Sequence, residues 1–105
     1  MTAGPWDRQL EAALGYEAKL VPALMDEWAP RVAVAADIHP GDQVLDVACG
    51  TGGLARAAAT RAGPGGSVAG LDLDPAMLAV AARLSPALRW HRGRAEALPF
   101  ADRAF

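Results

Sequence analysis

The stretch VLDVACGTGG, residues 44–53, decides the fold of this chain. Its first half is rich in valine and leucine and predicts a short buried strand. Gly50, Gly52 and Gly53 then allow a tight turn into a helix, whose first backbone N–H groups have no partner within the helix. Because a ligand can approach bare backbone at such a turn, the stretch predicts a strand–turn–helix unit with a binding site at the turn.

Strand and helix signals alternate along the rest of residues 40–105. Asp74 is expected to cap the helix that follows it, and Leu84 to belong to the buried stripe of that helix. The order β-α-β-α-β predicts a parallel sheet with right-handed crossovers, and the apolar first strand predicts burial on both faces. The fold class is therefore α/β, a doubly wound parallel sheet represented by its N-terminal part of about three strands. The predicted elements are strand 43–48, helix 53–62, strand 67–73, a helix from Pro75, and strand 87–91.

Residues 1–39 form a separate region that is predicted to be helical and to precede the sheet. Gly15 is expected to break the first helix, Pro22 to lie in the first turn of the second, and Pro30 to start a third short helix. An apolar face at helical spacing favours packing in the core, with a lid over a substrate site as the alternative. The residues of this face are Leu20, Val21, Leu24, Met25 and Trp28.

The composition excludes several classes of protein. With 105 residues, 52% of them hydrophobic and 21% charged, the chain is one domain at most and can bury a core. The net charge of -2 and the scattered arginines, Arg56 among them, are typical of a solvated surface and predict no nucleic-acid partner. Cys49 is the single cysteine, so neither an internal disulfide nor a metal site is predicted. Without a signal peptide or an apolar run of ~20 residues, we expect a cytoplasmic protein with no membrane partner.

A carboxylate that ends the second predicted strand narrows the choice of ligand. Asp72 follows Gly52 by 20 residues, and both lie where the carboxyl ends of adjacent parallel strands meet and bind ligands. There Asp72 can accept hydrogen bonds from both hydroxyls of a ribose. The pattern at residues 50–55 matches the G-x-G-x-x-G/A of dinucleotide sites. Asp46, inside the first strand, instead suits the ammonium and sulfonium groups of S-adenosylmethionine, since an acid is unhelpful beside a pyrophosphate.

Three segments, in order, resemble the signature motifs of class I S-adenosylmethionine-dependent methyltransferases of the ubiquinone/menaquinone-biosynthesis type. They are VLDVACGTG at 44–52, GLDLDPAML at 70–78 and GRAEALPF at 93–100. The resemblance covers about residues 40–105, a partial cofactor-binding domain, and implies a Rossmann-like fold. It also implies S-adenosylmethionine as the cofactor and a full-length enzyme that methylates a small molecule.

The resemblance implies a role for each matching position, and it assigns no catalytic residue. Asp46 and the backbone from Ala48 to Gly52 would hold the methionine part of the cofactor, and Asp72 would bind the ribose. Arg94 stands where the family often has an aspartate for the adenine amino group, and it has no acceptor atom, so Glu96 or a backbone carbonyl would have to substitute. The implied cofactor-binding residues are Asp46, Ala48, Cys49, Gly50, Thr51, Gly52, Asp72, Leu73 and Met77 (against the adenine), Ala95 and Glu96 (at its edge).

Simpler roles remain open for several of these residues. Asp46 could be a structural acid and Asp72 a cap of the following loop, while Cys49 is predicted to be a small buried side chain and not a nucleophile. At the level of function, the alternatives are a non-catalytic S-adenosylmethionine-binding fragment and an NAD- or FAD-binding oxidoreductase domain. The remaining aromatic and histidine side chains are expected in helix packing (Trp6, Tyr16, Trp28) and at turns or the surface (His39, His91).

The family fold implies a larger sheet, with the first strand in its middle. This sequence supplies three strands and stops after Asp102-Arg103-Ala104, where the family enters its fourth strand, so we expect a fragment. The first strand would then be an apolar, unprotected edge, and such edges pair with other chains. The sequence thus predicts self-association through this strand.

Overall fold

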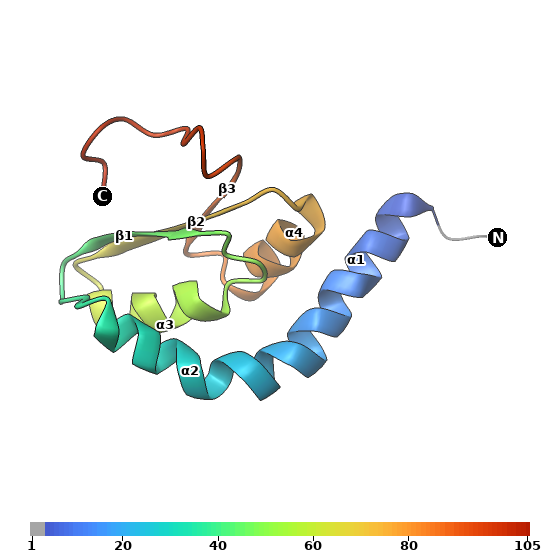
Figure 1. Cartoon of the computed structure of the whole chain (residues 1–105), viewed down its shortest axis with the longest axis horizontal. Coiled ribbons are helices and arrows are strands. Elements are labelled where there is room, and N and C mark those ends of the chain that lie inside the picture. Colours follow the sequence, from blue (N-terminus) through green and yellow to red (C-terminus); the bar gives the residue numbers. More distant parts are fainter. Residues whose placement is uncertain (1–3) are drawn as a thin grey trace.

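A computed structural model describes residues 4–105 and contains a three-stranded parallel sheet flanked by helices (Figure 1). The strands lie in the order β1-β2-β3, and a helix forms each crossover. The predicted α/β class is confirmed, as an N-terminal set of three strands preceded by helices. The elements are α1 Pro5–Gly15, the π-helical turn η1 Tyr16–Leu20, α2 Val21–Ala35, β1 Gln43–Val47, α3 Gly53–Ala62, β2 Ser67–Asp72, α4 Pro75–Leu84 and β3 Arg89–Arg92.

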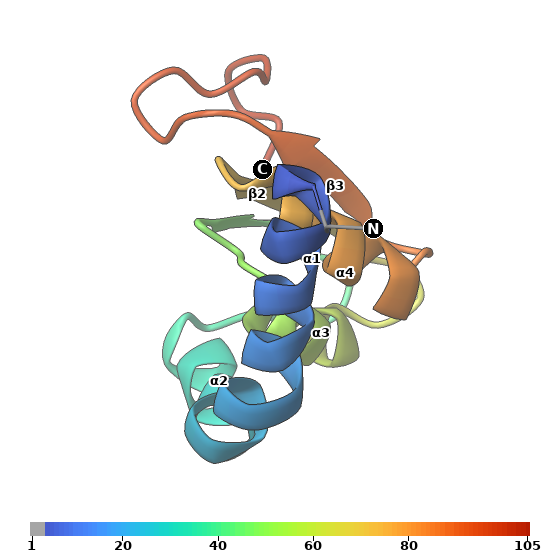
Figure 2. The same cartoon turned by 90° about the vertical axis from the view of Figure 1, so that its right-hand side faces the viewer.

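Helices α2 and α3 and the C-terminal segment lie on opposite sides of the sheet. In Figure 1 α2 and α3 lie below the sheet while residues 93–105 run above it, and Figure 2 shows α2, α3 and this segment at opposite ends of the view. The ring of His91 on β3 meets Phe100 of this segment edge to face, with centroids 4.9 Å apart. Phe100 in turn meets Phe105 at 5.0 Å. Short aromatic contacts therefore hold the C-terminal segment to the face of the sheet opposite α2 and α3.

Two helices begin and pack as their local sequence predicts. The Asp74 side chain accepts a hydrogen bond from the Ala76 N–H at 2.9 Å, and Pro75 occupies the first turn of α4. The alanines along one face of α3 allow its backbone to approach the sheet closely. The main core cluster accordingly consists of small residues, Ala33, Ile38, Ala55, Ala58, Ala62 and Val68.

The edge position of β1 changes the burial that its apolar sequence predicts. β1 is only half-buried and Val47 is 42% exposed, whereas Val68 to Leu71 of β2 are buried. Burial of β1 on both faces is therefore wrong for the described residues, since β1 has a neighbouring strand on one side alone. The third strand also starts later than predicted, because Leu88 donates to the Ser85 carbonyl and closes a turn there.

The helical region departs from the sequence prediction at two positions. Gly15 has helical φ and ψ of -63° and -41°, so the chain continues without a break into η1. Pro30 does not start a new helix but lies inside α2, which continues to Ala35. A proline removes one helical hydrogen bond, but Ala29 and Ala33 stay buried on either side of it, so tertiary packing outweighs the local signal. Pro22 lies in the first turn of α2, as predicted.

The apolar face of residues 20–28 is mostly not part of the core. Val21 is buried and Met25 is half-buried, so the prediction that this face packs in the core is confirmed for these two residues only. Leu20, Leu24 and Trp28 are 48%, 56% and 56% exposed, because the side of α2 that meets α3 continues through Ala29 and Ala33 instead. Leu84 at the end of α4 is likewise half-exposed, against the prediction of a buried stripe.

No helix within residues 4–105 combines the length and the apolar character that crossing a membrane requires.

Candidate functional site

The predicted site residues gather where the carboxyl ends of the three strands meet. The glycine turn, residues 48–53, follows β1, Asp72 ends β2, and residues 93–96 follow β3. Between these segments lies a hollow of about 150 Å³. Its lining consists of Val47, Ala48, Leu71, Asp72, Leu73, Gly93, Ala95 and Glu96.

The backbone of the glycine turn has an unusual conformation. Ala48, Gly50 and Gly52 have φ angles of +60°, +58° and +93°, all in the left-handed region. For Ala48 this conformation costs about 1–2 kcal/mol, since its Cβ crowds the backbone. Strain of this kind persists where the surrounding structure demands it, often at functional sites.

The ring of Trp90 on β3 packs directly against the glycine turn. A Cβ atom added to Gly52 would lie 2.6 Å from its Cη2, and one added to Gly70 would lie 2.5 Å from its Cζ3. The indole N–H donates to the Ser85 carbonyl at 2.9 Å, which fixes the ring. No local sequence signal predicts a role for Trp90. Its pairing with Gly70 across β2 and β3 is the signal that could have found it.

Asp72 connects the two turns at the site. Its Oδ2 accepts from the N–H of Gly50 and its Oδ1 from the N–H of Asp74, both at 2.8 Å. The alternative role as a cap of the following loop is therefore confirmed, and it extends to the glycine turn. Each carboxylate oxygen has a further lone pair, so these bonds leave room for the hydroxyls of a ligand.

Asp46 is a carboxylate held in an unfavourable environment beneath the turn. Burial is the main reason that the pKa of its carboxyl rises to about 6; the N–H of Ala55 lowers this pKa, and the negative charge of Asp72 raises it. Its Oδ2 is buried and has no hydrogen-bond partner within residues 4–105. A buried acceptor without a partner is rare and marks a place that a ligand can complete.

Cys49 has the surroundings of an unreactive thiol. Its side chain is 8% exposed, and its backbone N–H donates to the Leu71 carbonyl at 2.9 Å. Burial and the charges of Asp46 and Asp72 raise the pKa of the thiol to about 12. The thiolate is the nucleophilic form, so the raised pKa disfavours a nucleophilic role, and Cys49 is a small buried side chain, as predicted.

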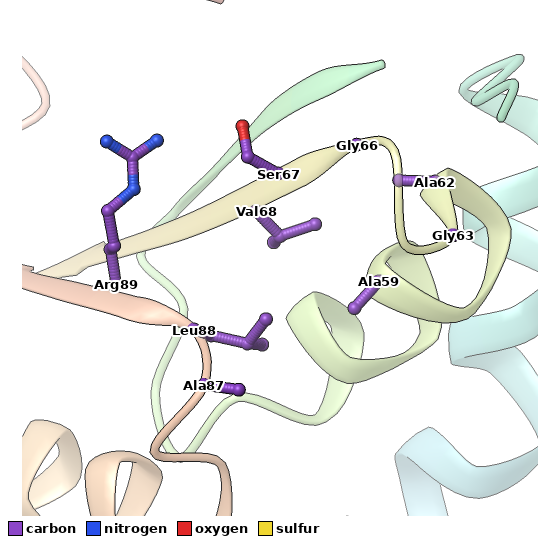
Figure 3. A pocket seen from close by; sticks show the side chains of 9 residues that line it. All are labelled: Ala59, Ala62, Gly63, Gly66, Ser67, Val68, Ala87, Leu88 and Arg89. Atoms are coloured by element: carbon purple, nitrogen blue, oxygen red, sulfur yellow. The ribbon is translucent and has the colours of Figure 1, made fainter. Parts of the chain in front are cut away.

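A larger hollow of about 210 Å³ lies at the opposite end of the sheet, by the amino ends of β2 and β3 (Figure 3). In this view Ala59, Val68 and Leu88 converge, while the Ser67 hydroxyl and the Arg89 guanidinium point away from them. Alanine and glycine supply most of the remaining lining. Because its polar groups are directed outward, this hollow is a packing gap, and the hollow beside Asp72 is the candidate site.

The structure brings together most, but not all, of the predicted adenine-binding residues. Leu73 is 57% exposed at the hollow beside Ala95 and Glu96. Met77 is half-buried and packs on the cluster of Ala13, Ala76 and Val80, so it contacts α1 and does not line the hollow.

Two side chains assigned to the surface are partly buried instead. Arg56 donates from Nη1 to the Thr51 carbonyl at 2.7 Å and from Nη2 to Glu17 at 2.6 Å, so the prediction of a solvated arginine is wrong. His91 packs against Phe100, and its Nε2 is buried. Glu17 is 39 residues from Arg56, and Phe100 reaches His91 only through the fold of the C-terminal segment, so local composition could not identify either partner. His39, by contrast, is exposed at a turn, as predicted.

Comparison with known proteins identifies the family. A family model described as a methyltransferase domain matches residues 44–105, which include the glycine turn and every segment that lines the hollow. The chain belongs to this methyltransferase-domain family. Its glycine turn, Asp72 and the segment after β3 thus lie in the shared part of the methyltransferase domain.

The methyltransferase-domain relatives are longer than this chain. A demethylmenaquinone methyltransferase of Chlorobaculum parvum is 49% identical over 63 residues, 60% of this chain and 25% of the relative. A 2-phytyl-1,4-naphtoquinone methyltransferase of Synechocystis is 38% identical over 84 residues, 74% of this chain and 35% of the relative. A solved TehB-like SAM-dependent methyltransferase of Corynebacterium glutamicum aligns with a TM-score of 0.64 and 26% identity, over 83% of this chain and 46% of its own. The chain therefore spans about a quarter to a third of the curated relatives it matches.

Substitution of Asp46 by asparagine should change how stability depends on pH. The folded-state pKa of about 6 exceeds the ordinary 3.8, so between these values the folded chain holds a proton that the unfolded chain has lost. Stability should therefore fall as pH rises from about 4 to 6. The side chain of Asp46→Asn cannot ionise. The free energy of unfolding of this variant, relative to that of wild type, should therefore rise by roughly 1–2 kcal/mol between pH 4.5 and pH 8, a figure reduced for the partial exposure of the side chain.

Thermal unfolding followed by circular dichroism at the two pH values measures this difference. Asp102→Asn, at an exposed position, is the matched control and should follow wild type. A constant gap between Asp46→Asn and wild type at both pH values would contradict the prediction.

Proposed function

We propose that this chain carries the S-adenosylmethionine-binding part of a methyltransferase that acts on a small molecule. The observation that supports this most strongly is the pair of carboxylates at the glycine turn, Asp46 and Asp72. They are close enough for the negative charge of Asp72 to raise the pKa of Asp46. A negative field there favours the ammonium and sulfonium groups of this cofactor and disfavours a pyrophosphate. The SAM-dependent relative of known structure adds support for the same cofactor.

The proposed contacts combine the hollow beside Asp72 with Asp46, which does not line that hollow but accepts from the Ala55 N–H in the first turn of α3. The unpartnered Oδ2 of Asp46 would face the cationic methionine part, and Asp72 would accept from the ribose hydroxyls while it retains both backbone N–H bonds. Leu73 offers an exposed apolar side chain to the adenine, beside the backbone of Ala95 and the side chain of Glu96. The backbone from Ala48 to Gly52, including Cys49, Gly50 and Thr51, completes the set. Met77 would support the site indirectly, because it packs against the cluster of Ala13, Ala76 and Val80.

When bound, the cofactor supplies an activated methyl group. A transfer of that kind depends mainly on proximity and alignment, so this chain would hold the donor in place and exclude water around it. The two curated relatives are named for methylation of quinone-type molecules, which supports a small-molecule acceptor. We assign no catalytic residue.

The proposal extends to organisation and location. We propose residues 1–39 as an N-terminal helical segment, of which 1–3 lie outside the described residues, and 40–105 as the cofactor-binding part, which the family match over 44–105 supports. A cytoplasmic location is proposed from the single cysteine, which offers no internal disulfide.

Calorimetric titration separates the candidate ligands. The chain should bind S-adenosylhomocysteine saturably with one site, and NAD and FAD should give no saturable heat. Saturable binding of NAD or FAD alone would instead show an oxidoreductase-type domain. If none of the three ligands binds, the proposed function is wrong for this chain.

We also propose that the outer edge of β1 pairs with a second copy of the chain. Within residues 4–105, β1 is hydrogen-bonded only to β2, which leaves one edge open. Val47 is 42% exposed, and a hollow of about 110 Å³ lies between β1 and the helices α2 and α3, where Val44, Leu45 and Asp46 of the strand line it. Open apolar edges associate, and a charge on the edge prevents it.

Light scattering after size-exclusion chromatography tests this association. Wild type should exceed the monomer mass as concentration rises, and Val47→Lys should remain monomeric. Val34→Lys is the control, because Val34 is also exposed, at 57% against 42% for Val47, but lies on α2, and this variant should behave as wild type. A wild-type monomer at every concentration would overturn the proposal.

A further inference from the structure

Arg56 makes a two-pronged contact between parts of the chain that are far apart in sequence. Nη1 donates to the Thr51 carbonyl at 2.7 Å, and Nη2 donates to Glu17 Oε1 at 2.6 Å. The side chains of Arg56 and Glu17 are 31% and 19% exposed, so water screens their ion pair less than it screens a surface pair. Short charge-assisted bonds of this kind are among the stronger ones in proteins.

On one side, Arg56 helps to fix the orientation of the glycine turn. The peptide between Thr51 and Gly52 is held at both ends, because its carbonyl accepts from Arg56 and its N–H donates to the Cys49 carbonyl at 3.1 Å. A peptide group is planar, so these two bonds together set its direction. Gly52 has a φ of +93°, which glycine adopts without strain, so the residue type permits this turn and the two bonds fix the direction of its peptide group.

On the other side, Arg56 holds the helical segment. Glu17 lies in η1, whose wider π-helical turn is a feature that is frequent at functional sites. The same turn presents Tyr16, whose Cε1 would lie 3.8 Å from a Cβ at Gly50. Val21, just after η1, would meet a Cβ at Gly53 at 3.3 Å. The helical segment thus contacts the glycine turn at both ends, with the Arg56 bonds between them.

We propose that Arg56 is a positioning residue that couples docking of the helical segment to ligand affinity at the glycine turn. The proposal rests on the proposed function for the identity of the ligand. Coupling of this kind is reciprocal. Ligand binding should tighten η1 against the turn, and a loosened Glu17–Arg56 pair should weaken ligand binding.

The chain offers closely matched variants for a test. Glu17→Gln retains the shape of the side chain and removes the charge, while Arg56→Lys retains the charge and removes the fork that reaches both partners. Arg61→Lys is the control, since Arg61 lies on the same helix and also donates to a carbonyl, that of Ile38 at 3.0 Å, away from the turn.

Hydrogen–deuterium exchange and calorimetry with S-adenosylhomocysteine measure the coupling. In wild type the ligand should slow amide exchange at residues 16–20. In Glu17→Gln and Arg56→Lys this slowing should disappear and Kd should rise roughly five- to tenfold, whereas Arg61→Lys should match wild type. Wild-type affinity in both site variants, or a bound ligand that leaves exchange at 16–20 unchanged in wild type, would overturn the proposal.

The same variants separate failure of the coupling from failure of the proposed function. If wild type does not bind S-adenosylhomocysteine, the proposed function fails, and the coupling is still tested in the free chain. Glu17→Gln should then accelerate exchange at both 16–20 and 50–53. Acceleration at 16–20 alone would show that Glu17 holds its own helix and nothing more.

Discussion

Substitution of Asp72 by alanine should weaken the binding of S-adenosylhomocysteine by roughly 2–4 kcal/mol, through loss of charge-assisted hydrogen bonds to the ribose. Stability should fall as well, since the N–H groups of Gly50 and Asp74 both lose their acceptor. Asp72 therefore has a double role, because the bonds that shape the site come from the carboxylate proposed to bind the ligand. Calorimetry gives the affinity and thermal unfolding gives the stability.

The neighbouring carboxylate provides the control that separates the two effects. Asp74 caps α4 through the Ala76 N–H, so Asp74→Ala should lower the free energy of unfolding by about 1 kcal/mol. It should leave ligand affinity unchanged. If Asp72→Ala folds and binds with wild-type affinity, Asp72 has only its structural role.

Substitution of Gly70 by alanine should destabilise the fold strongly, because there is no space for a methyl group at this position of β2. The new Cβ would lie 2.5 Å and 2.6 Å from two ring carbons of Trp90 and 2.8 Å from the sulfur of Cys49. Such overpacking costs about 1–3 kcal/mol or more, because the indole is held by Ser85 and cannot simply rotate away. Urea unfolding measures the loss.

A distant glycine and a second-site change check the cause. Gly65→Ala has no atom within 4 Å of its new methyl group and should leave stability nearly unchanged. In a Trp90→Leu background, the added penalty of Gly70→Ala should become much smaller, since the clashing ring is gone. An equal penalty in both backgrounds would show that the ring is not its cause.

Signals carried by immediate neighbours predicted the fold well. Asp74 and Pro75 define the start of α4, the glycines after β1 define the turn, and the alternation of strand and helix defines a parallel sheet. Each of these depends on backbone preferences within a few residues. They could therefore be read without knowledge of the partners.

Predictions that depend on packing partners were less successful. The apolar sequence of β1 indicates burial, but its edge position leaves Val47 exposed. The helical spacing of Leu24 and Trp28 indicates a core face, but both side chains are exposed to solvent. Pro30 carries a break signal, yet the helix continues because its neighbours are buried. In each case the outcome depends on what covers the residue, which is not a local property.

At the site, the residue types at the strand ends come from sequence, and their arrangement comes from the tertiary structure. The VLDVACGTGG stretch and Asp72 specify a strand, a glycine turn and a nearby carboxylate, because local backbone preferences and the parallel topology bring them to one edge. Only packing decided that Trp90 supports Gly52, that Met77 faces α1, and that Arg56 joins Glu17 to the turn. These contacts join residues up to 39 positions apart, so they exist only once the sheet and the helical segment have come together.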